Sequence, residues 1–166
     1  VIDEAKLNKL KKICITSTSI EDTKNALKLT ALDSDLFITT CGIHPHYADT
    51  FKTTDIKKII DLCEQPSIKA IGETGLDFNR NFSKKNNQIS CFLSQIEIAE
   101  QLSLPLFMHQ RDAHKDFLNC FKEIDLTVKA VVHCFTEDKK KFYEYLDKGF
   151  WIGFTGWICD PIRGRH

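Results

Sequence analysis

Short apolar runs alternate with amphipathic stretches along the chain. The apolar runs are rich in β-branched and aromatic residues and have the length of strands. The stretches between them carry apolar residues at helical spacing, most clearly over 86–102. Strands are expected over 12–17, 36–41, 67–72, 104–108, 128–132 and 150–154. Helices are expected up to 31 after an N-cap at Ser19, up to 63 after an N-cap at Thr53 or Thr54, and over 86–102, 113–121 and 138–147, with residues 1–10 as the tail of an earlier helix.

Alternation of strands and helices through short links predicts an α/β fold with a parallel sheet. The strands are mostly continuous apolar runs, as expected when both faces of a sheet are covered. Residues 1–166 contain no low-complexity segment and no linker. We therefore expect one domain, or part of one, over residues 1–166.

Polar side chains follow four of the expected strands. His44, Glu73, His109 and His133 each come within three residues of the end of a strand, about one βα unit apart. The carboxyl ends of parallel strands meet on one face of the fold, where active sites are built. A single histidine in such a place is more often solvated or part of the core. Four in register predict a shared site.

Glu73 raises a question of charge. It follows an apolar run and stands between Gly72 and Gly75, where a buried carboxylate needs a cationic partner. Imidazoles and a carboxylate are natural ligands for a divalent cation, which would supply that charge. A Cys134–His133 nucleophile pair is the alternative, but adjacent strand residues point to opposite faces.

Composition narrows the class of protein. Of the 166 residues, 42% are hydrophobic and 28% are charged, with a formal net charge of zero. Such a balance argues against an extended basic surface, although an enzyme needs only a local cationic groove. No signal peptide or membrane span is apparent. The seven cysteines form no CxxC motif, which favours reduced thiols and a cytoplasmic protein.

Five sequence motifs follow one another along the chain: GIHPHYA (42–48), AIGETGLDFNRNFS (70–83), PLFMHQRDAH (105–114), VVHCFT (131–136) and IGFTGW (152–157). In this order and spacing they resemble the TatD family of metal-dependent deoxyribonucleases. The resemblance covers the whole chain and implies a TIM-type (β/α)₈ barrel of the metallo-dependent hydrolase superfamily. It also implies a 3′→5′ exonuclease for single-stranded DNA, with RNA left open as a substrate. The expected cofactor is Mg²⁺, with Mn²⁺ or Zn²⁺ as alternatives, and the full-length protein is expected to be a monomer.

The resemblance assigns roles to individual residues. Glu73, His109 and His133 match the metal ligands of the family. His44 and Arg111 are expected to be catalytic residues that hold the phosphate.

Other residues are expected further from the metal. His46 and Arg80 are expected to bind substrate, with a solvated loop charge as the alternative for Arg80. Phe78, Phe82 and Trp157 are candidates for stacking on bases, with packing in the loop as the favoured alternative for Phe78. Asp77 is a candidate for orienting a ligand histidine.

The chain also departs from the family pattern. A first strand with paired histidines and a last strand with a ligand aspartate have no counterpart in it. We therefore expect strands two to seven of an incomplete barrel. Two alternatives to the nuclease stay open: a hydrolase of amides or small esters from the same superfamily, and a catalytically inactive fragment.

Overall fold

The computed structural model describes residues 2–162 and contains one six-stranded sheet. All five strand pairs are parallel, and the order of the strands in the sheet is their order in the chain. The predicted α/β fold with a parallel sheet is confirmed. The strands are β1 (Ile13–Ile15), β2 (Phe37–Cys41), β3 (Ile68–Asp77), β4 (Leu106–Arg111), β5 (Ala130–Val132) and β6 (Trp151–Ile152).

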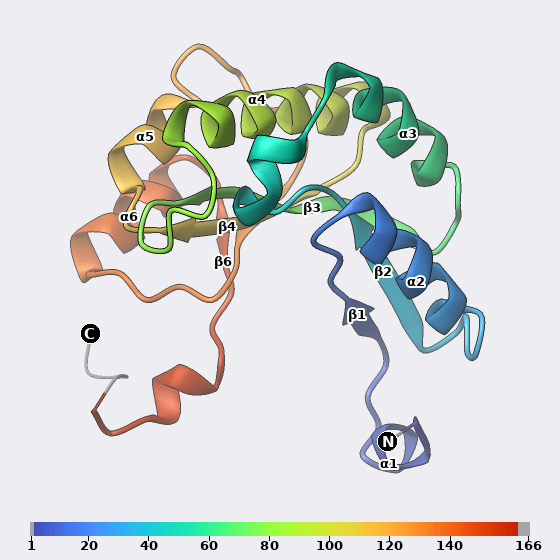
Figure 1. The fold of residues 1–166 in the computed structure, drawn as a ribbon. Coiled ribbons are helices and arrows are strands. Elements are labelled where there is room, and N and C mark those ends of the chain that lie inside the picture. Colours follow the sequence, from blue (N-terminus) through green and yellow to red (C-terminus); the bar gives the residue numbers. More distant parts are fainter. Residues whose placement is uncertain (1, 163–166) are drawn as a thin grey trace.

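Helices connect the strands and lie on the outer side of the sheet. Figure 1 shows the sheet curling beneath an arc that runs from α2 to α6, so that the described residues form a half-barrel. Helix α1 and the C-terminal turn η2 lie on the other side of this arc. The helices are α1 (Ile2–Leu7), α2 (Ile20–Thr30), α3 (Thr53–Cys63), α4 (Lys85–Leu102), α5 (His114–Asn119) and α6 (Lys139–Asp147), with 3₁₀ turns η1 (Pro45–Thr50) and η2 (Gly156–Cys159).

Local signals in the sequence place these helices well. Ser19 caps α2 by accepting a hydrogen bond from the Asp22 N–H, and Asp138 caps α6 in the same way from Lys141. The predicted N-cap at Thr53 or Thr54 is wrong, because Lys52 is the N-cap of α3 and Thr53 is its first residue. The Asp55 carboxylate accepts from the Lys52 N–H at this end of the helix. The expected helix over 1–10 is found as α1, and Val1 lies outside the described residues.

The core lies between the sheet and the central helix α4. Phe92, Ile96 and Ala99 of α4 are almost completely buried, as their helical spacing requires. The Phe92 ring stacks on Phe117 of α5 with ring centroids 5.2 Å apart. Leu106 on β4 is fully buried in the same cluster. This packing fixes α4 against the strands that carry the site.

Two strands run further than the sequence pattern predicts. The third strand was expected to end at Gly72, but β3 continues through Glu73 to Asp77. The fourth was expected to end at Met108, but β4 continues to Arg111. The extensions pair with each other, because Thr74 to Asp77 run beside Met108 to Arg111 after a register shift. Glu73 and His109 therefore lie within strands and not after them.

Gly75 allows these two extensions to pass close together. Its φ is +137°, a value that L side chains rarely adopt. A Cβ at this position would lie 2.0 Å from the carbonyl oxygen of His109. The backbone of β3 can approach β4 here only because Gly75 has no side chain.

The structure also bears on the state of the cysteines and on whether any helix could cross a membrane. All seven cysteines are free, as expected for reduced thiols. Among residues 2–162, no helix is both long and apolar enough to cross a membrane.

The contact at Gly75 generates a prediction about stability. Gly75→Ala should lower the free energy of unfolding by about 3 kcal/mol or more, because the methyl group meets backbone that cannot move without breaking the pairing of β3 with β4. Thermal and denaturant unfolding of the full-length protein measure the loss. Gly156→Ala is the matched control, since a Cβ there meets no atom within 4 Å. Equal stability of the two variants would contradict the prediction.

Candidate metal centre

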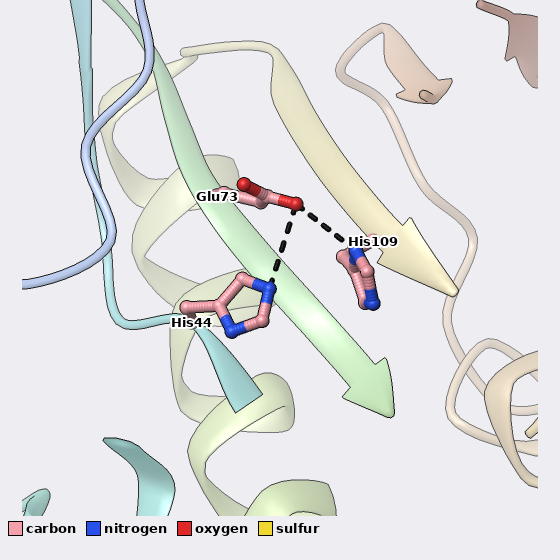
Figure 2. Close-up of side chains that lie close together, drawn as sticks. All are labelled: His44, Glu73 and His109. Atoms are coloured by element: carbon pink, nitrogen blue, oxygen red, sulfur yellow. Dashed lines mark hydrogen bonds and ion pairs between the residues drawn. The ribbon is translucent and has the colours of Figure 1, made fainter. Parts of the chain in front are cut away.

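Three imidazoles surround one buried carboxylate oxygen. Glu73 Oε1 lies 2.5 Å from His133 Nε2, 3.0 Å from His109 Nδ1 and 3.6 Å from His44 Nε2. Figure 2 shows His44 and His109 pointing at this oxygen from two sides. The predicted convergence of Glu73, His44, His109 and His133 is therefore present in the structure.

Neighbouring strands deliver these side chains. Glu73 projects from β3 and His109 from β4, where His109 pairs with Gly75. His133 directly follows β5, and its N–H donates to the carbonyl oxygen of Met108 on β4. His44 follows β2 and begins the turn η1. Because all four strands are parallel, residues from distant parts of the sequence meet at one edge of the sheet.

The electrostatics of Glu73 follow from this arrangement. Burial raises the pKa of its carboxyl group, but the hydrogen bonds from His109, His133 and His44 outweigh burial and hold the pKa well below its usual range. Glu73 is therefore a carboxylate at neutral pH. Its side chain is only 11% exposed. Water therefore solvates the negative charge poorly, and the imidazoles or a bound cation must stabilise it.

His44 differs from the other two histidines in the nitrogen that it uses. Its Nδ1 accepts a hydrogen bond from the backbone N–H of His46, at 3.2 Å. Burial lowers the pKa of His44, which favours the neutral ring. In a neutral ring whose Nδ1 accepts, Nε2 carries the proton. His44, Glu73 and His109 lie close enough together to share an ion, and the Nε2–H of a neutral His44 can also donate a hydrogen bond.

Asp77 connects the cluster to the following loop. Its Oδ2 lies 2.8 Å from His46 Nε2 and 3.4 Å from His109 Nε2. Its Oδ1 accepts from the backbone N–H groups of Asn79 and Arg80. The carboxylate thus holds the loop and lies beside His109, whose orientation by Asp77 stays a prediction. His46, expected to bind substrate, is engaged with Asp77.

Two buried glutamines of α4, which the sequence interpretation missed, hold the backbone beside the cluster. Gln95 accepts from the Ile43 N–H at 2.7 Å and donates to the Ile43 carbonyl at 3.0 Å. Gln88 makes the same pair of bonds with Asp77, at 2.9 and 3.1 Å. Both amides are fully buried and stand seven residues apart. The sequence did contain a signal for these two glutamines, because each interrupts the apolar face of α4 with a polar side chain.

The two arginines lie apart from the cluster. Arg80 is exposed on the loop after β3, where its backbone N–H is bonded to Asp77. Arg111 ends β4 and lines a separate cavity with Asn79, Asp112 and Trp157. Within residues 2–162, neither guanidinium makes a hydrogen bond or ion pair with Glu73 or its histidines. The structure therefore does not bring Arg111 into the carboxylate cluster.

The cluster fits a divalent cation. His109 Nε2 is buried and makes no hydrogen bond within the described part of the chain. With Asp77 facing Nε2, the Nδ1 of His109 is directed toward Glu73. The ligand atoms of His44, Glu73 and His109 all lie within 4.8 Å of one another, which is close enough to share one ion. His133 reaches the same carboxylate oxygen, with its Nε2 2.5 Å from Glu73 Oε1. Imidazoles and a carboxylate are ligands of the kinds that transition-metal ions such as Zn²⁺ accept.

A parallel half-barrel with outer helices and a polar cluster at its carboxyl edge defines a chain of the TIM-type α/β class. Comparison with known proteins identifies the group within that class. The sequence model of the family described as TatD related DNase matches residues 1–163, and the chain belongs to this family.

Curated relatives and solved structures agree with this assignment. The 3′-5′ ssDNA/RNA exonuclease TatD of Escherichia coli K12 is 40% identical over 153 residues, which are 92% of this chain and 58% of the relative. Its namesake in Erwinia amylovora is 39% identical over 167 residues, 100% of this chain and 64% of the relative. The chain thus spans about three fifths of the length of these relatives.

Among solved structures, a TatD family hydrolase from Entamoeba histolytica superposes with a TM-score of 0.85 at 32% identity, covering 93% of this chain and 55% of that one. A TatD homolog from Escherichia coli superposes with a TM-score of 0.83 at 24% identity, covering 96% and 64%, and supports the fold alone.

The glutamine contacts yield a prediction about the site. Gln95→Met should lower the free energy of unfolding by about 2–4 kcal/mol, because it leaves the buried N–H and carbonyl of Ile43 without partners. Ile43 precedes His44, so activity should also fall in the protein that remains folded. Gln101→Met, at an exposed position of the same helix, is the control. Denaturation and assays on the full-length protein would refute the role of Gln95 if both variants behaved alike.

Proposed function

We propose that the full-length protein containing this chain is a metal-dependent 3′→5′ exonuclease of single-stranded DNA, with RNA as a further substrate. The observation that carries the proposal is the buried Glu73 carboxylate encircled by His44, His109 and His133. Membership of the TatD related DNase family and the names of the curated relatives support the same activity.

Glu73, His109 and His133 would hold the cation. A bound divalent cation neutralises phosphate charge and acidifies water in hydrolases of this kind. Mg²⁺ is proposed from the family resemblance, while two imidazoles and a carboxylate also suit Mn²⁺ or Zn²⁺. Asp77 would keep His109 turned toward the site, and Gln88 and Gln95 would keep the adjoining backbone in place.

His44 would act on the substrate directly. Its Nε2–H faces Glu73 in the cluster, where it could donate a hydrogen bond to a phosphate oxygen and stabilise the charge that develops there. The His46 N–H that occupies Nδ1 maintains this tautomer. His46, itself bonded to Asp77, would support the loop that faces the substrate, and Arg80 would meet the nucleic acid further out.

The setting of the enzyme is part of the proposal. Seven free cysteines favour a reducing compartment, and we propose a cytoplasmic protein. We propose a monomer at full length. A hydrolase of amides or small esters is the competing activity, and a panel of such compounds beside single-stranded DNA separates the two.

The metal assignment leads to a prediction for Glu73. Glu73→Gln should reduce divalent-metal-dependent degradation of single-stranded DNA by at least about 100-fold, since even residues that only support a metal ligand contribute 10–100-fold. EDTA should abolish the wild-type activity, and excess metal should restore it. Glu97→Gln, at an exposed glutamate of α4, is the control. Wild-type rates from the Glu73 variant, or activity in EDTA, would contradict the assignment of Glu73 as a metal ligand.

The tautomer argument leads to a prediction for His44. His44→Ala should lower kcat by about 100-fold or more, the usual loss when a hydrogen-bond donor to the transition state is removed, while the Kd for metal stays close to the wild-type value. His109→Ala should instead weaken metal binding by at least about tenfold. Calorimetry with the metal alone measures both affinities. If the His44 variant weakens metal binding as strongly as His109→Ala does, His44 is a metal ligand and the prediction is wrong.

A further inference from the structure

The backbone pairing of β4 with β5 ends where two of the proposed metal ligands begin. The last pair in the register is Met108 beside Val132. The N–H of His133 then donates to the carbonyl oxygen of Met108 at 2.9 Å. Within the described part of the chain, no backbone hydrogen bond joins residues 109–111 to residues 133–137. Further hydrogen bonds between these two segments therefore involve side chains.

Gln110 makes one such connection on the helix side of the sheet. It follows His109 on β4, and adjacent strand residues point to opposite faces, so its amide faces the helices. With the amide oriented to satisfy both of its ends, Gln110 accepts from the N–H groups of Ala113 and His114 at 3.1 and 2.8 Å. It also donates to Glu137 Oε1 at 3.2 Å. The amide thus joins the end of β4 to the beginning of α5 and to the segment after β5.

The His114 ring makes a second connection, from α5 to α6. Its Nε2 lies 2.6 Å from Glu144 Oε2, and its Nδ1 lies 3.0 Å from the hydroxyl oxygen of Tyr145. An ionised carboxylate can only accept, so Nε2 of a neutral ring carries the proton and Nδ1 accepts from the Tyr145 hydroxyl. Burial raises the pKa of Tyr145, and the charges of Glu137 and Glu144 raise it further, so the hydroxyl keeps the proton that it donates.

Tyr145 extends this connection to the segment that carries His133. Its side chain is fully buried. Its ring contacts Phe117 of α5 and Phe135, with ring centroids 5.7 and 6.2 Å apart. Phe135 stands two residues after His133. The position of the Tyr145 ring therefore affects the backbone close to a proposed ligand.

We propose that His114 and Tyr145 are positioning residues of the metal centre. Their hydrogen bond, together with the Gln110 amide, holds the segment after β5 against the end of β4. The two ligand histidines on these segments thereby keep the spacing at which both reach Glu73 Oε1. Both residues act through the backbone, and neither is a ligand of the ion. The inference rests on the proposed metal-dependent function and deepens it.

Metal binding by variants of the full-length protein tests this role. Tyr145→Phe removes only the hydroxyl and keeps the packed ring. Calorimetry with Mn²⁺ alone should show a Kd about tenfold weaker than that of the wild type, the lower end of the loss when the support of a metal ligand is removed. Tyr143→Phe, which removes an exposed hydroxyl from the same helix, is the matched control and should bind like the wild type.

A double-mutant cycle shows whether the two residues act through one bond. His114→Ala should also weaken Mn²⁺ binding by about tenfold. The double variant His114→Ala/Tyr145→Phe should be weakened no further, since both changes remove the same hydrogen bond. His114→Asn, which keeps an acceptor close to the position of Nδ1, should restore most of the affinity. Losses that multiply to about 100-fold in the double variant would overturn the shared role.

Kinetics separate positioning from a purely structural role. In Tyr145→Phe the metal concentration that half-activates DNA cleavage should rise about tenfold, while kcat at saturating metal and KM for DNA stay within about twofold of the wild type. A purely structural link between α5 and α6 would lower the melting temperature and leave the metal affinity of the folded protein unchanged. Wild-type affinity for Mn²⁺ in both Tyr145→Phe and His114→Ala would overturn the proposal.

The outcomes distinguish this inference from the proposed function. A wild type that binds Mn²⁺ more tightly than Tyr145→Phe but cleaves no DNA with metal would refute the nuclease and keep the positioning role. A wild type that cleaves DNA with metal, beside variants that bind Mn²⁺ as tightly as it does, would refute the positioning role and keep the nuclease.

Discussion

A buried negative charge organises this structure. Glu73 projects from β3 into a region that water barely reaches, and an uncompensated carboxylate in such a place would be costly. Compensation comes from His44, His109 and His133, which belong to three other strands or their ends. The four segments must therefore lie side by side, parallel and in register, for Glu73 to be tolerated. The site and the sheet depend on the same alignment.

Helix α4 fixes this alignment from outside the sheet. Its apolar residues, Phe92 and Ile96 among them, pack against the strands, and its two buried glutamines hold single peptide units of the neighbouring loops. A side-chain amide bonded to both the N–H and the C=O of one residue restrains position and orientation together. The helix thereby connects core packing to the geometry of the site.

Two imidazoles present different ring nitrogens to Glu73 because their neighbours differ. The His46 N–H occupies Nδ1 of His44, so Nε2 of His44 faces the carboxylate. Asp77 lies beside Nε2 of His109, so Nδ1 of His109 faces the carboxylate. The backbone and the neighbouring carboxylate thus decide which ring nitrogen each histidine offers to the cluster.

The sequence by itself determined the alternation of strands and helices, the parallel sheet and the four residues that meet at its edge. Apolar periodicity and strand-end position are local properties, and Ser19 and Asp138 mark helix starts with their own side chains. The tertiary structure alone decided that β3 and β4 run on past Glu73 and His109, because their extensions exist only by pairing with each other. It also decided that Gln88 and Gln95 bond to distant backbone, and that Arg111 lies in a cavity apart from the cluster. These features depend on contacts between residues far apart in the chain, which no local pattern records.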